Sequence, residues 1–259
     1  MMRMRGQTIC RKTKTMLNDQ DLIIPDWPAP PNVKALQTTR TGGISAPPYA
    51  ALNLGLHVGD QALHVAHNRQ QLARFVPTEP LWLDQVHGTL VVDAGAASCQ
   101  PQADAAYARA ANAVCTVMTA DCLPVLLCDC SGTVVAAVHA GWRGLLNGVL
   151  ESAIAAMQAA PNELMAWLGP AIGPMAFLVG DEVRTAFIMH DAEANAAFQA
   201  QADGKWLAGL YALARLRLSR QGVTAVYGGK FCTFSDTARF FSYRRDGVTG
   251  RMATMIWLA

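Results

Sequence analysis

Two histidines and one cysteine have side chains and positions that suit a metal site. His87, Cys122 and His139 each end or closely follow an apolar, strand-like run, and each lies beside a turn. Imidazole nitrogen and thiolate sulfur are ligands that suit Zn²⁺, and three protein ligands leave a fourth tetrahedral position open. No two of the three residues are close in sequence, as ligand pairs of a structural zinc knuckle usually are. The pattern therefore predicts a catalytic zinc site assembled from separate loops.

The same residues also fit a cysteine nucleophile. Cys122 would attack, His139 would act as the base, and Asp121 or His87 would orient that base. A metal gives both histidines a role, whereas this arrangement leaves one of them spare. The sequence favours the metal without excluding the nucleophile.

Composition restricts the class of protein. The chain has 259 residues, of which 52% are hydrophobic and 15% charged, so it can bury a substantial core and does not resemble a disordered protein. No apolar stretch is long enough to span a bilayer, so we expect no membrane association. The 7 cysteines do not form a spaced disulfide framework, which indicates a reducing cytoplasm.

The basic charge lies in residues 1–20, which we interpret as a leader outside the fold. A disordered start, or initiation at Met16, explains this segment better than a transit peptide. The rest of the chain is mildly acidic and has no basic stripe, so nucleic acid is not an expected partner. We expect residues 21–259 to form a single catalytic domain that acts as a monomer.

Hydrophobic spacing predicts both helices and strands. Apolar residues at helical intervals predict helices over 60–76, with Asp60 as the cap, and over 146–157, 183–190 and 207–218. Strand-like runs cover 33–38, 81–86, 90–93, 114–118, 125–128, 133–138, 164–168, 223–227 and 249–258. Because helices and strands alternate irregularly, the pattern favours an α/β (α+β) protein with a mixed sheet over a regular βαβ winding.

Several further polar residues are candidates for substrate binding. Arg40 precedes a Gly-Gly loop, and Asn53 follows a Pro-Pro-Tyr segment. Gln85 shares the face of His87 if their segment is extended. Arg69 falls on the apolar stripe of its helix, where it either extends its charge to solvent or meets a buried partner or a substrate anion.

The segment 240–245, Phe-Phe-Ser-Tyr-Arg-Arg, combines aromatic rings with guanidinium groups. Such a lining suits a flat base together with a phosphate or carboxylate, and it makes Tyr243 and Arg244 candidates for substrate binding. The alternative is an ordinary amphipathic strand that enters a turn.

Eight motifs together identify a known family. In order, they are Thr39-Arg40-Thr41-Gly42-Gly43, Asn53-Leu54-Gly55, His57-Val58-Gly59-Asp60, Asn68-Arg69, Asp84-Gln85-Val86-His87-Gly88, Ala120-Asp121-Cys122-Leu123-Pro124, His139-Ala140-Gly141-Trp142-Arg143-Gly144 and Phe241-Ser242-Tyr243-Arg244-Arg245. They resemble the YfiH family, also called the multicopper polyphenol oxidase or laccase-domain family, which includes peptidoglycan editing factors. The resemblance extends from about Leu22 to Ala259.

The resemblance implies a fold, a cofactor and an activity. It implies a single four-layer α/β/β/α domain with a cysteine-hydrolase-like fold, and zinc held by His87, Cys122 and His139. It also implies phosphorolysis of adenosine, inosine, guanosine and methylthioadenosine to a free base and ribose 1-phosphate. Adenosine deamination is a further implied activity. Members have also been described as laccases, cysteine hydrolases and editors of peptidoglycan precursors.

The histidine count argues against the laccase activity. A laccase needs a blue-copper centre and a three-copper cluster, both ligated mainly by imidazole. The chain has 6 histidines, too few for such an array, and those outside the motif pair fall in helix or loop contexts away from it: His57, His64, His67 and His190. Copper would be an adventitious occupant of the three-ligand site.

These observations lead to a zinc enzyme whose partners are purine nucleosides and phosphate. In deamination, zinc would lower the pKa of a bound water that attacks C6 of adenine. Phosphorolysis needs a cationic group for phosphate, for which Arg143 is the first candidate, with Arg40 or Arg244 as alternates. Asp121 is either a proton shuttle or a structural neighbour of the metal ligand. The alternative function is hydrolysis of an amide in a peptidoglycan precursor, by metal-bound water or by Cys122.

Overall fold

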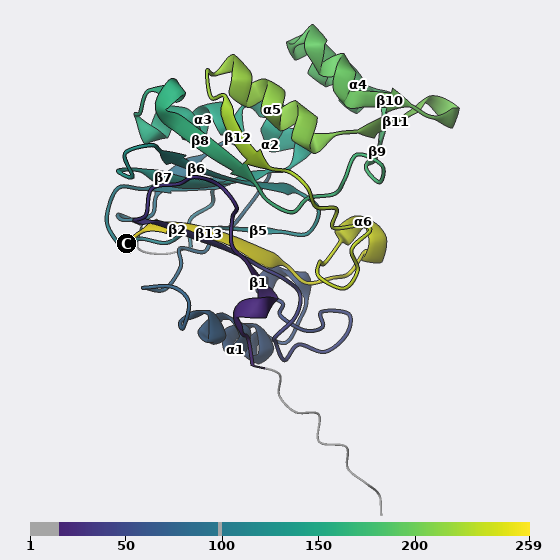
Figure 1. Cartoon of the computed structure of the whole chain (residues 1–259). Coiled ribbons are helices and arrows are strands. Elements are labelled where there is room, and N and C mark those ends of the chain that lie inside the picture. Colours follow the sequence, from purple (N-terminus) through teal and green to yellow (C-terminus); the bar gives the residue numbers. More distant parts are fainter. Residues whose placement is uncertain (1–15, 98–99) are drawn as a thin grey trace, which may run out of the picture.

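Two β-sheets lie face to face in the computed structural model, which describes residues 16–97 and 100–259 (Figure 1). The larger sheet is mixed and has 6 strands in the order β12-β8-β6-β7-β4-β3. In chain order these strands are β3 (Val91–Asp93), β4 (Ala105–Ala108), β6 (Leu123–Asp129), β7 (Val135–Ala140), β8 (Leu164–Leu168) and β12 (Ala225–Gly228). Its pairs β3–β4 and β12–β8 are parallel, and the others are antiparallel.

The second sheet has 4 antiparallel strands in the order β1-β2-β13-β5. They are β1 (Leu22–Ile23), β2 (Val33–Thr38), β5 (Cys115–Thr119) and β13 (Met252–Leu258). The last strand of the chain therefore lies in the middle of this sheet, paired with β2 on one side and β5 on the other.

The central strands are apolar on both faces because both faces are covered. Every residue of β5, β6 and β7 is buried. Within β6, Leu126 and Cys128 point toward the four-stranded sheet, whereas Leu123, Val125 and Leu127 point toward the helices. This alternation follows from the two-residue period of a strand. A continuous apolar run is therefore the sequence pattern that such a strand requires.

Helices cover the outer faces of the two sheets (Figure 1). Against the six-stranded sheet pack α2 (Trp142–Asn147), α3 (Val149–Met157) and α5 (Leu210–Arg220), and α4 (Asp181–His190) lies beyond them, in contact with α2. The outer face of the four-stranded sheet packs against α1 (Ala62–Leu72) and the loop that carries Leu52 and Leu54. The short helix α6 (Tyr243–Asp246) precedes β13. The 3₁₀ helices are η1 (Asp19–Asp21), η2 (Leu56–Val58), η3 (Pro161–Glu163), η4 (Ala192–Ala197) and η5 (Ala202–Gly204).

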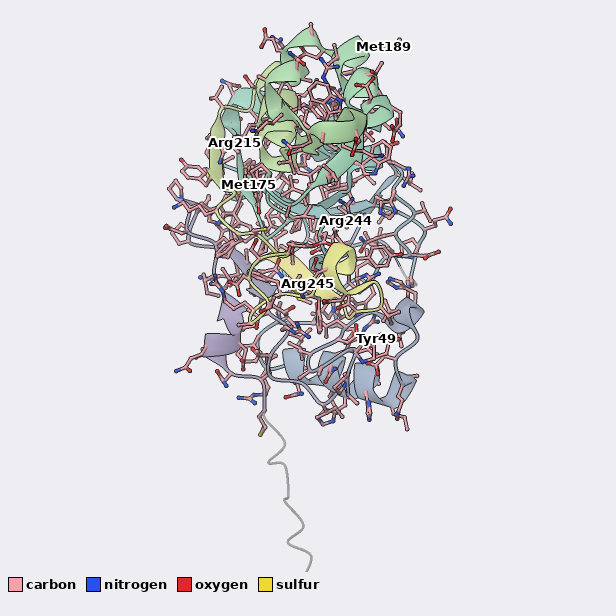
Figure 2. The ribbon with its side chains drawn as sticks, turned by 90° about the vertical axis from the view of Figure 1, so that its right-hand side faces the viewer. Tyr49, Met175, Met189, Arg215, Arg244 and Arg245 are labelled. Atoms are coloured by element: carbon pink, nitrogen blue, oxygen red, sulfur yellow. The ribbon has the colours of Figure 1, made fainter. Side chains whose placement is uncertain are left out.

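A third sheet was not anticipated from the sequence. Strands β9 (Leu178–Gly180), β10 (Phe198–Ala200) and β11 (Lys205–Ala208) form a small antiparallel sheet beside α4. Figure 2 shows Met189, near the end of α4, at the opposite end of the molecule from Tyr49. The four-layer description implied by the family does not contain this sheet.

Several predicted elements have the expected bounds, and others need correction. The strands at 33–38 and 164–168 are confirmed, as is the mixed α/β character. The segment 81–86 is not a strand, because it forms only isolated bridges from Leu81 and Asp84. The helix predicted over 146–157 is divided at Gly148, whose φ of 98° ends α2 and precedes α3.

Two predictions about helix positions also change. The helix predicted over 207–218 begins only at Leu210, because the residues before it pair in β11. The N-cap of α1 is Gln61, since the Asp60 carboxylate instead accepts hydrogen bonds from Ser45 and Asn53. On α1, the Arg69 guanidinium donates to the Leu54 carbonyl and stacks 3.8 Å from the ring centroid of Trp82.

The start of the folded part lies ahead of the predicted boundary at residue 21. Of the proposed leader, residues 1–15 lie outside the described residues. Leu17 is fully buried, and its N–H donates to the side chain of Gln71 at 2.8 Å. Asn18 caps η1, so both residues belong to the domain. None of the described helices is both long and apolar enough to cross a membrane.

The apolar layer between the sheets should be the main source of stability. Leu126 is fully buried in this layer, whereas Leu63 on α1 is 83% exposed. We expect Leu126→Ala to lower the free energy of unfolding by about 2–5 kcal/mol, because it leaves a cavity. Leu63→Ala, the matched control, should change it by less than about 0.5 kcal/mol. Urea denaturation measures both, and equal effects would contradict this placement of the core.

Candidate functional site

His87, Cys122 and His139, which are far apart in sequence, meet in the folded protein. One ligand atom from each lies within 4.8 Å of the others. The His87 Nε2 and Cys122 Sγ atoms are 3.7 Å apart, and the centroids of the two imidazole rings are 4.9 Å apart. The structure thus brings together the three residues that the sequence identified as metal ligands.

Each of the three side chains comes from the end of a strand or from a loop. Cys122 directly precedes β6, and His139 lies in β7, which pairs with β6 so that His139 is opposite Pro124. His87 has a backbone φ of 61°, a left-handed conformation that is uncommon for a residue other than glycine. A Cβ atom on Gly141 would lie 2.7 Å from the His87 ring and 3.1 Å from Cys122 Sγ. Only glycine therefore allows both ligands to pack against this backbone.

A buried carboxylate that the sequence analysis missed connects the two histidines. Asp104 is fully buried just before β4, and its Oδ1 lies 2.7 Å from Nδ1 of His139. The same carboxylate accepts the backbone N–H groups of Val86, His87 and Gly88 at 3.2, 3.0 and 2.6 Å. Asp104 therefore fixes the His139 ring through Nδ1 and also holds the strained loop that carries His87.

The charges of the site are strongly coupled. Burial alone would raise the pKa of Cys122, but the charge and hydrogen bond of His139, together with His87, lower it to about 6. Burial alone would lower the pKa of His139, but Cys122 and Asp104 raise it to about 9. Burial would also raise the pKa of Asp104, yet the hydrogen bond and charge of His139 hold it below its usual range. Without a metal, the geometry favours a thiolate–imidazolium pair.

The three donors fit a zinc ion chemically. Imidazole nitrogen and thiolate sulfur both bind zinc, at about 2.0–2.3 Å, and catalytic zinc sites use three protein ligands with a fourth position open. Asp104 completes the arrangement, because a carboxylate on the distal nitrogen orients a ligating imidazole and increases its basicity. Among the described residues this is the only group of three or more potential metal ligands. The site thus lacks the further ligand sets that a multicopper centre needs.

His87, Cys122 and His139 line a cavity of about 500 Å³. Its wall combines the ligands with aromatic, cationic and amide side chains. The lining residues are His57, Gln85, His87, Met118, Thr119, Ala120, Cys122, His139, Trp142, Arg143, Tyr243 and Arg251.

Three of the remaining candidates from the sequence lie in this wall. Arg143 is exposed, and its guanidinium lies 4.6 Å from the ring centroid of Trp142. Tyr243 is 60% exposed at the beginning of α6. The Gln85 amide donates to the Met118 carbonyl at 2.8 Å and accepts its N–H at 2.7 Å. Gln85 therefore shapes the wall with its polar atoms already paired.

Arg40, Asn53 and Arg244 do not line the cavity, and their side chains hold other parts of the chain. Arg40 donates to the carbonyls of Ala50 and Thr237. Asn53 is fully buried and holds the backbone N–H groups of Gly55 and Arg251. Arg244 donates to the carbonyl of Leu178, and its charge lies over Phe177.

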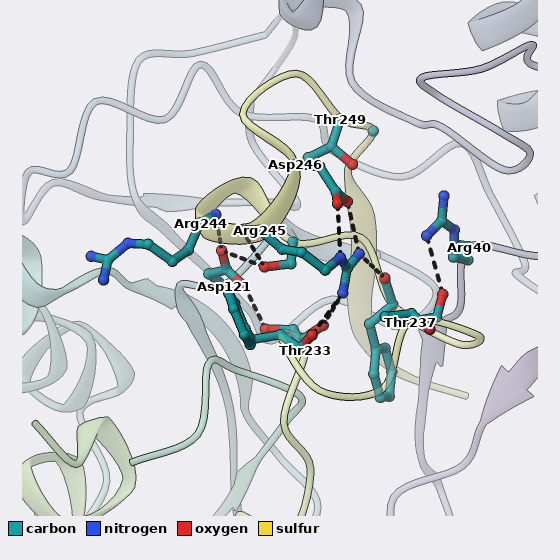
Figure 3. A network of polar contacts seen from close by, with 12 residues as sticks. Arg40, Asp121, Thr233, Thr237, Arg244, Arg245, Asp246 and Thr249 are labelled. Atoms are coloured by element: carbon teal, nitrogen blue, oxygen red, sulfur yellow. Dashed lines mark hydrogen bonds and ion pairs between the residues drawn. The ribbon is translucent and has the colours of Figure 1, made fainter. Parts of the chain in front are cut away.

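Asp121 precedes a metal ligand but does not line the cavity. Its carboxylate accepts hydrogen bonds from the hydroxyls of Thr233 and Ser242 and from the backbone N–H of Arg244 (Figure 3). Both oxygens are therefore occupied in joining two loops. Of the two roles that the sequence left open, these contacts favour the structural one over a proton shuttle.

The segment 240–245 is neither a strand nor an aromatic lining. Phe240 and Phe241 are fully buried in a cluster of their own, and only Tyr243 reaches the cavity. Arg245 pairs with Asp246 and donates to three carbonyls, those of Thr233, Phe234 and Phe240 (Figure 3). This arginine ties the loops beneath α6 together.

Four residues of the site were missed by the sequence analysis: Asp104, His57, Trp142 and Arg251. His57 was placed away from the motif histidines, but it lines the same cavity. Burial and the charge of Arg251 lower the pKa of His57. His57 and Trp142 lie in two of the eight family motifs, and Asp104 is a single acid at the start of an alanine-rich buried segment, so for these three residues the sequence carried a signal.

Comparison with known proteins shows which family the chain matches. Residues 34–259 match the family described as multi-copper polyphenol oxidoreductase laccase. The chain belongs to this family. A Neisseria meningitidis protein of the same family, also called DUF152, has a crystal structure that matches with a TM-score of 0.90 at 54% identity, covering 92% of this chain and 99% of that one.

Relatives of this chain carry a functional name, as two examples show. A purine nucleoside phosphorylase of Pseudomonas aeruginosa is 54% identical over 237 residues, covering 91% of this chain and 98% of the relative. The purine nucleoside phosphorylase YfiH of Escherichia coli is 53% identical over 240 residues, covering 92% and 98%. The name of the laccase family and the names of its members thus point to different chemistry.

Replacing Asp104 tests its role in positioning the ligands. We expect Asp104→Asn to weaken metal binding about 10- to 100-fold, since His139 loses the charge that orients it. Metal content after dialysis against graded chelator measures this effect. Asp203→Asn is the matched control, because Asp203 is exposed and does not line the cavity. Unchanged metal affinity in Asp104→Asn would show that the carboxylate does not support the ligands.

Proposed function

We propose that the protein is a zinc-dependent purine nucleoside phosphorylase that also deaminates adenosine. The main support is the combination of a His–Cys–His group in a cavity with relatives of that name over nearly the whole chain. The substrates would be adenosine, inosine, guanosine and methylthioadenosine together with phosphate. The described cysteines are all free, which supports action in a reducing cytoplasm.

Zinc would be held by His87, Cys122 and His139, and when bound it supplies a Lewis acid beside the cavity. The chain itself positions these ligands. Asp104 occupies Nδ1 of His139, so that Nε2 faces Cys122. The backbone of Gly141 lies against two of the ligands and leaves no room for a larger residue.

The nucleoside would bind through its flat base. Trp142 and Tyr243 line the cavity, and aromatic side chains stack well on purines. The amide of Gln85 is paired with the Met118 backbone. Gln85 would therefore limit the space for the base without forming hydrogen bonds to its edge.

Phosphorolysis transfers the sugar from base to phosphate. A phosphate oxygen forms a bond to C1′ while the C1′–N9 bond breaks, and the bonding electron pair leaves with the base. Phosphate needs a cationic partner for this step. Of the three arginines considered from the sequence, only Arg143 lines the cavity, so among them it is the phosphate-binding candidate.

The products distinguish the two proposed activities. We expect the zinc-loaded protein to convert adenosine and phosphate to adenine and ribose 1-phosphate, and adenosine without phosphate to inosine at most. Chromatography of both reactions measures this, with His139→Ala losing both activities and the exposed His190→Ala keeping them. Release of adenine and free ribose without phosphate would instead make the protein a hydrolase.

One observation favours a second function. Cys122, His139 and Asp104 form a nucleophile–base–orienter arrangement, with Asp104 in the place that the sequence analysis gave to Asp121 or His87. The lowered pKa of Cys122 suits a nucleophilic thiolate. On this basis the second candidate is a cysteine hydrolase of amides, such as those in peptidoglycan precursors.

Alkylation of Cys122 separates the two functions. As a zinc ligand, Cys122 should react slowly with iodoacetamide at about pH 7 and become reactive once a chelator removes the metal. Labelling of the exposed Cys130 is the internal control and should not respond to the chelator. Mass spectrometry of both sites, alongside turnover, measures the effect. Fast labelling of Cys122 in metal-loaded, active protein would favour the hydrolase.

A further inference from the structure

Arg251 is a cation of the cavity wall that forms no salt bridge within the described part of the chain. Its side chain is partly buried and lines the cavity together with the three ligand residues. Within residues 16–97 and 100–259, no carboxylate lies within salt-bridge distance of it. A cation removed from water is costly unless an opposite charge compensates it. Among the described residues, Asp121 and Cys122 stabilise this charge without a hydrogen bond to it, so the guanidinium can also bind an anionic ligand directly.

The position of Arg251 is fixed by its surroundings. Its N–H donates to Asn53 Oδ1 at 2.9 Å, and its carbonyl accepts the N–H of Leu54 at 3.1 Å. Nη1 donates to the carbonyls of Thr249 and Gly250 at 3.0 and 3.1 Å. The side-chain stem lies so close to Gly55 that a Cβ there would be 2.8 Å from Arg251 Cγ. The guanidinium is thus oriented before any ligand binds.

Part of the guanidinium remains available. In the described part of the chain, Nε and Nη2 of Arg251 donate no hydrogen bond to protein atoms. These two nitrogens form the edge of a guanidinium that binds two oxygens of a phosphate side by side. By contrast, the same edge of Arg69 is occupied by the Leu54 carbonyl, and that of Arg245 by Asp246.

The charge of Arg251 acts on the reactive part of the cavity. It interacts favourably with Cys122, and it lowers the pKa of the neighbouring His57. Both arginines of the wall lie over an aromatic ring, Arg143 at 4.6 Å from the Trp142 centroid and Arg251 at 5.9 Å from that of Tyr243, but Arg143 is exposed whereas Arg251 is partly buried. A fixed, partly desolvated cation binds an anion more strongly than an exposed one, because less solvent and less side-chain freedom must be given up.

We propose that Arg251 is the principal phosphate-binding residue of the cavity, holding two phosphate oxygens through Nε and Nη2, beside His57. Arg143 then makes a secondary contribution from its exposed position. The identity of the anion as a co-substrate rests on the proposed phosphorylase function. The presence of an anion subsite at Arg251 rests on the geometry alone.

The test measures binding of inorganic phosphate to the metal-loaded full chain by titration calorimetry. We expect Arg251→Gln to raise the Kd for phosphate about 30-fold or more, and Arg251→Lys about 10-fold, since lysine keeps the charge but not the paired donors. Arg143→Gln should raise it less than about 10-fold. Arg184→Gln is the matched control, because Arg184 also stacks on an aromatic ring but lies outside the cavity.

Kinetics show whether the effect is confined to phosphate. We expect Arg251→Gln to raise KM for phosphate in parallel with Kd, while KM for the nucleoside changes less than about 3-fold. Metal content and Tm verify folding. If Arg251→Gln does not fold, Arg251→Lys decides, because it preserves the side-chain stem and the charge.

The possible failures are distinguishable. No phosphate binding by the wild-type protein, an unchanged Kd in a folded Arg251 variant, or a larger loss in Arg143→Gln would overturn the assignment of Arg251. The last two results would leave the proposed phosphorylase function intact if the wild type still cleaves nucleosides with phosphate. Conversely, Arg251-dependent phosphate binding without nucleoside cleavage would support the subsite and reject the proposed function.

Discussion

The buried carboxylate of Asp104 is the constraint on which the site depends. A carboxylate removed from water must be paired, and this one receives three backbone N–H groups from the loop of His87 and faces Nδ1 of His139. Its four partners come from two segments that are far apart in sequence, residues 86–88 and the strand that carries His139. Satisfying one buried charge therefore places one ligand loop, orients the second imidazole and leaves Nε2 of that imidazole directed at Cys122. The layered sheets supply the rigid frame that makes this possible, because β4 and β7 are paired strands of one sheet.

Most arginines around the site also have a structural role, because their side chains donate hydrogen bonds to backbone carbonyls. Arg40, Arg69, Arg244 and Arg245 all satisfy backbone carbonyls, so their charges fasten loops to one another around the site. Asp121 does the same with the opposite charge, joining the loops of Thr233 and Ser242. Loops lack the regular backbone hydrogen bonds of a sheet. Hydrogen bonds from charged side chains take their place where a loop must be held in one position. The residues that remain unpaired, in the cavity wall, are then those free to meet a ligand.

The names within the family describe different reactions on one set of ligands. A single His–Cys–His group, the only one in the described part of the chain, is insufficient for the several copper centres of a laccase. Without metal, the same group has the charge distribution of a cysteine nucleophile with its base, since Cys122 is acidified and His139 is made more basic. Occupancy by a metal would suppress this nucleophile, because the metal occupies the thiolate lone pair. Metal content is thus the physical variable that separates the alternatives.

The sequence by itself determined the group of His87, Cys122 and His139 that could hold a metal ion, the family, the mixed α/β class and strands such as 33–38 and 164–168. These features could be predicted because they depend on residue type and on the two-residue period of buried strands, and both are local properties of the sequence. The small third sheet, the division of a helix at Gly148 and the loss of the strand at 81–86 depend on pairing and packing with distant segments. The same holds for the site: Asp104 and Arg251 carry no motif that marks them, and Arg40, Asn53 and Arg244 resemble ligand-binding residues until their partners are known. Whether a charged side chain binds a substrate or fastens a loop is decided by what the fold places beside it, and only the tertiary structure contains that information.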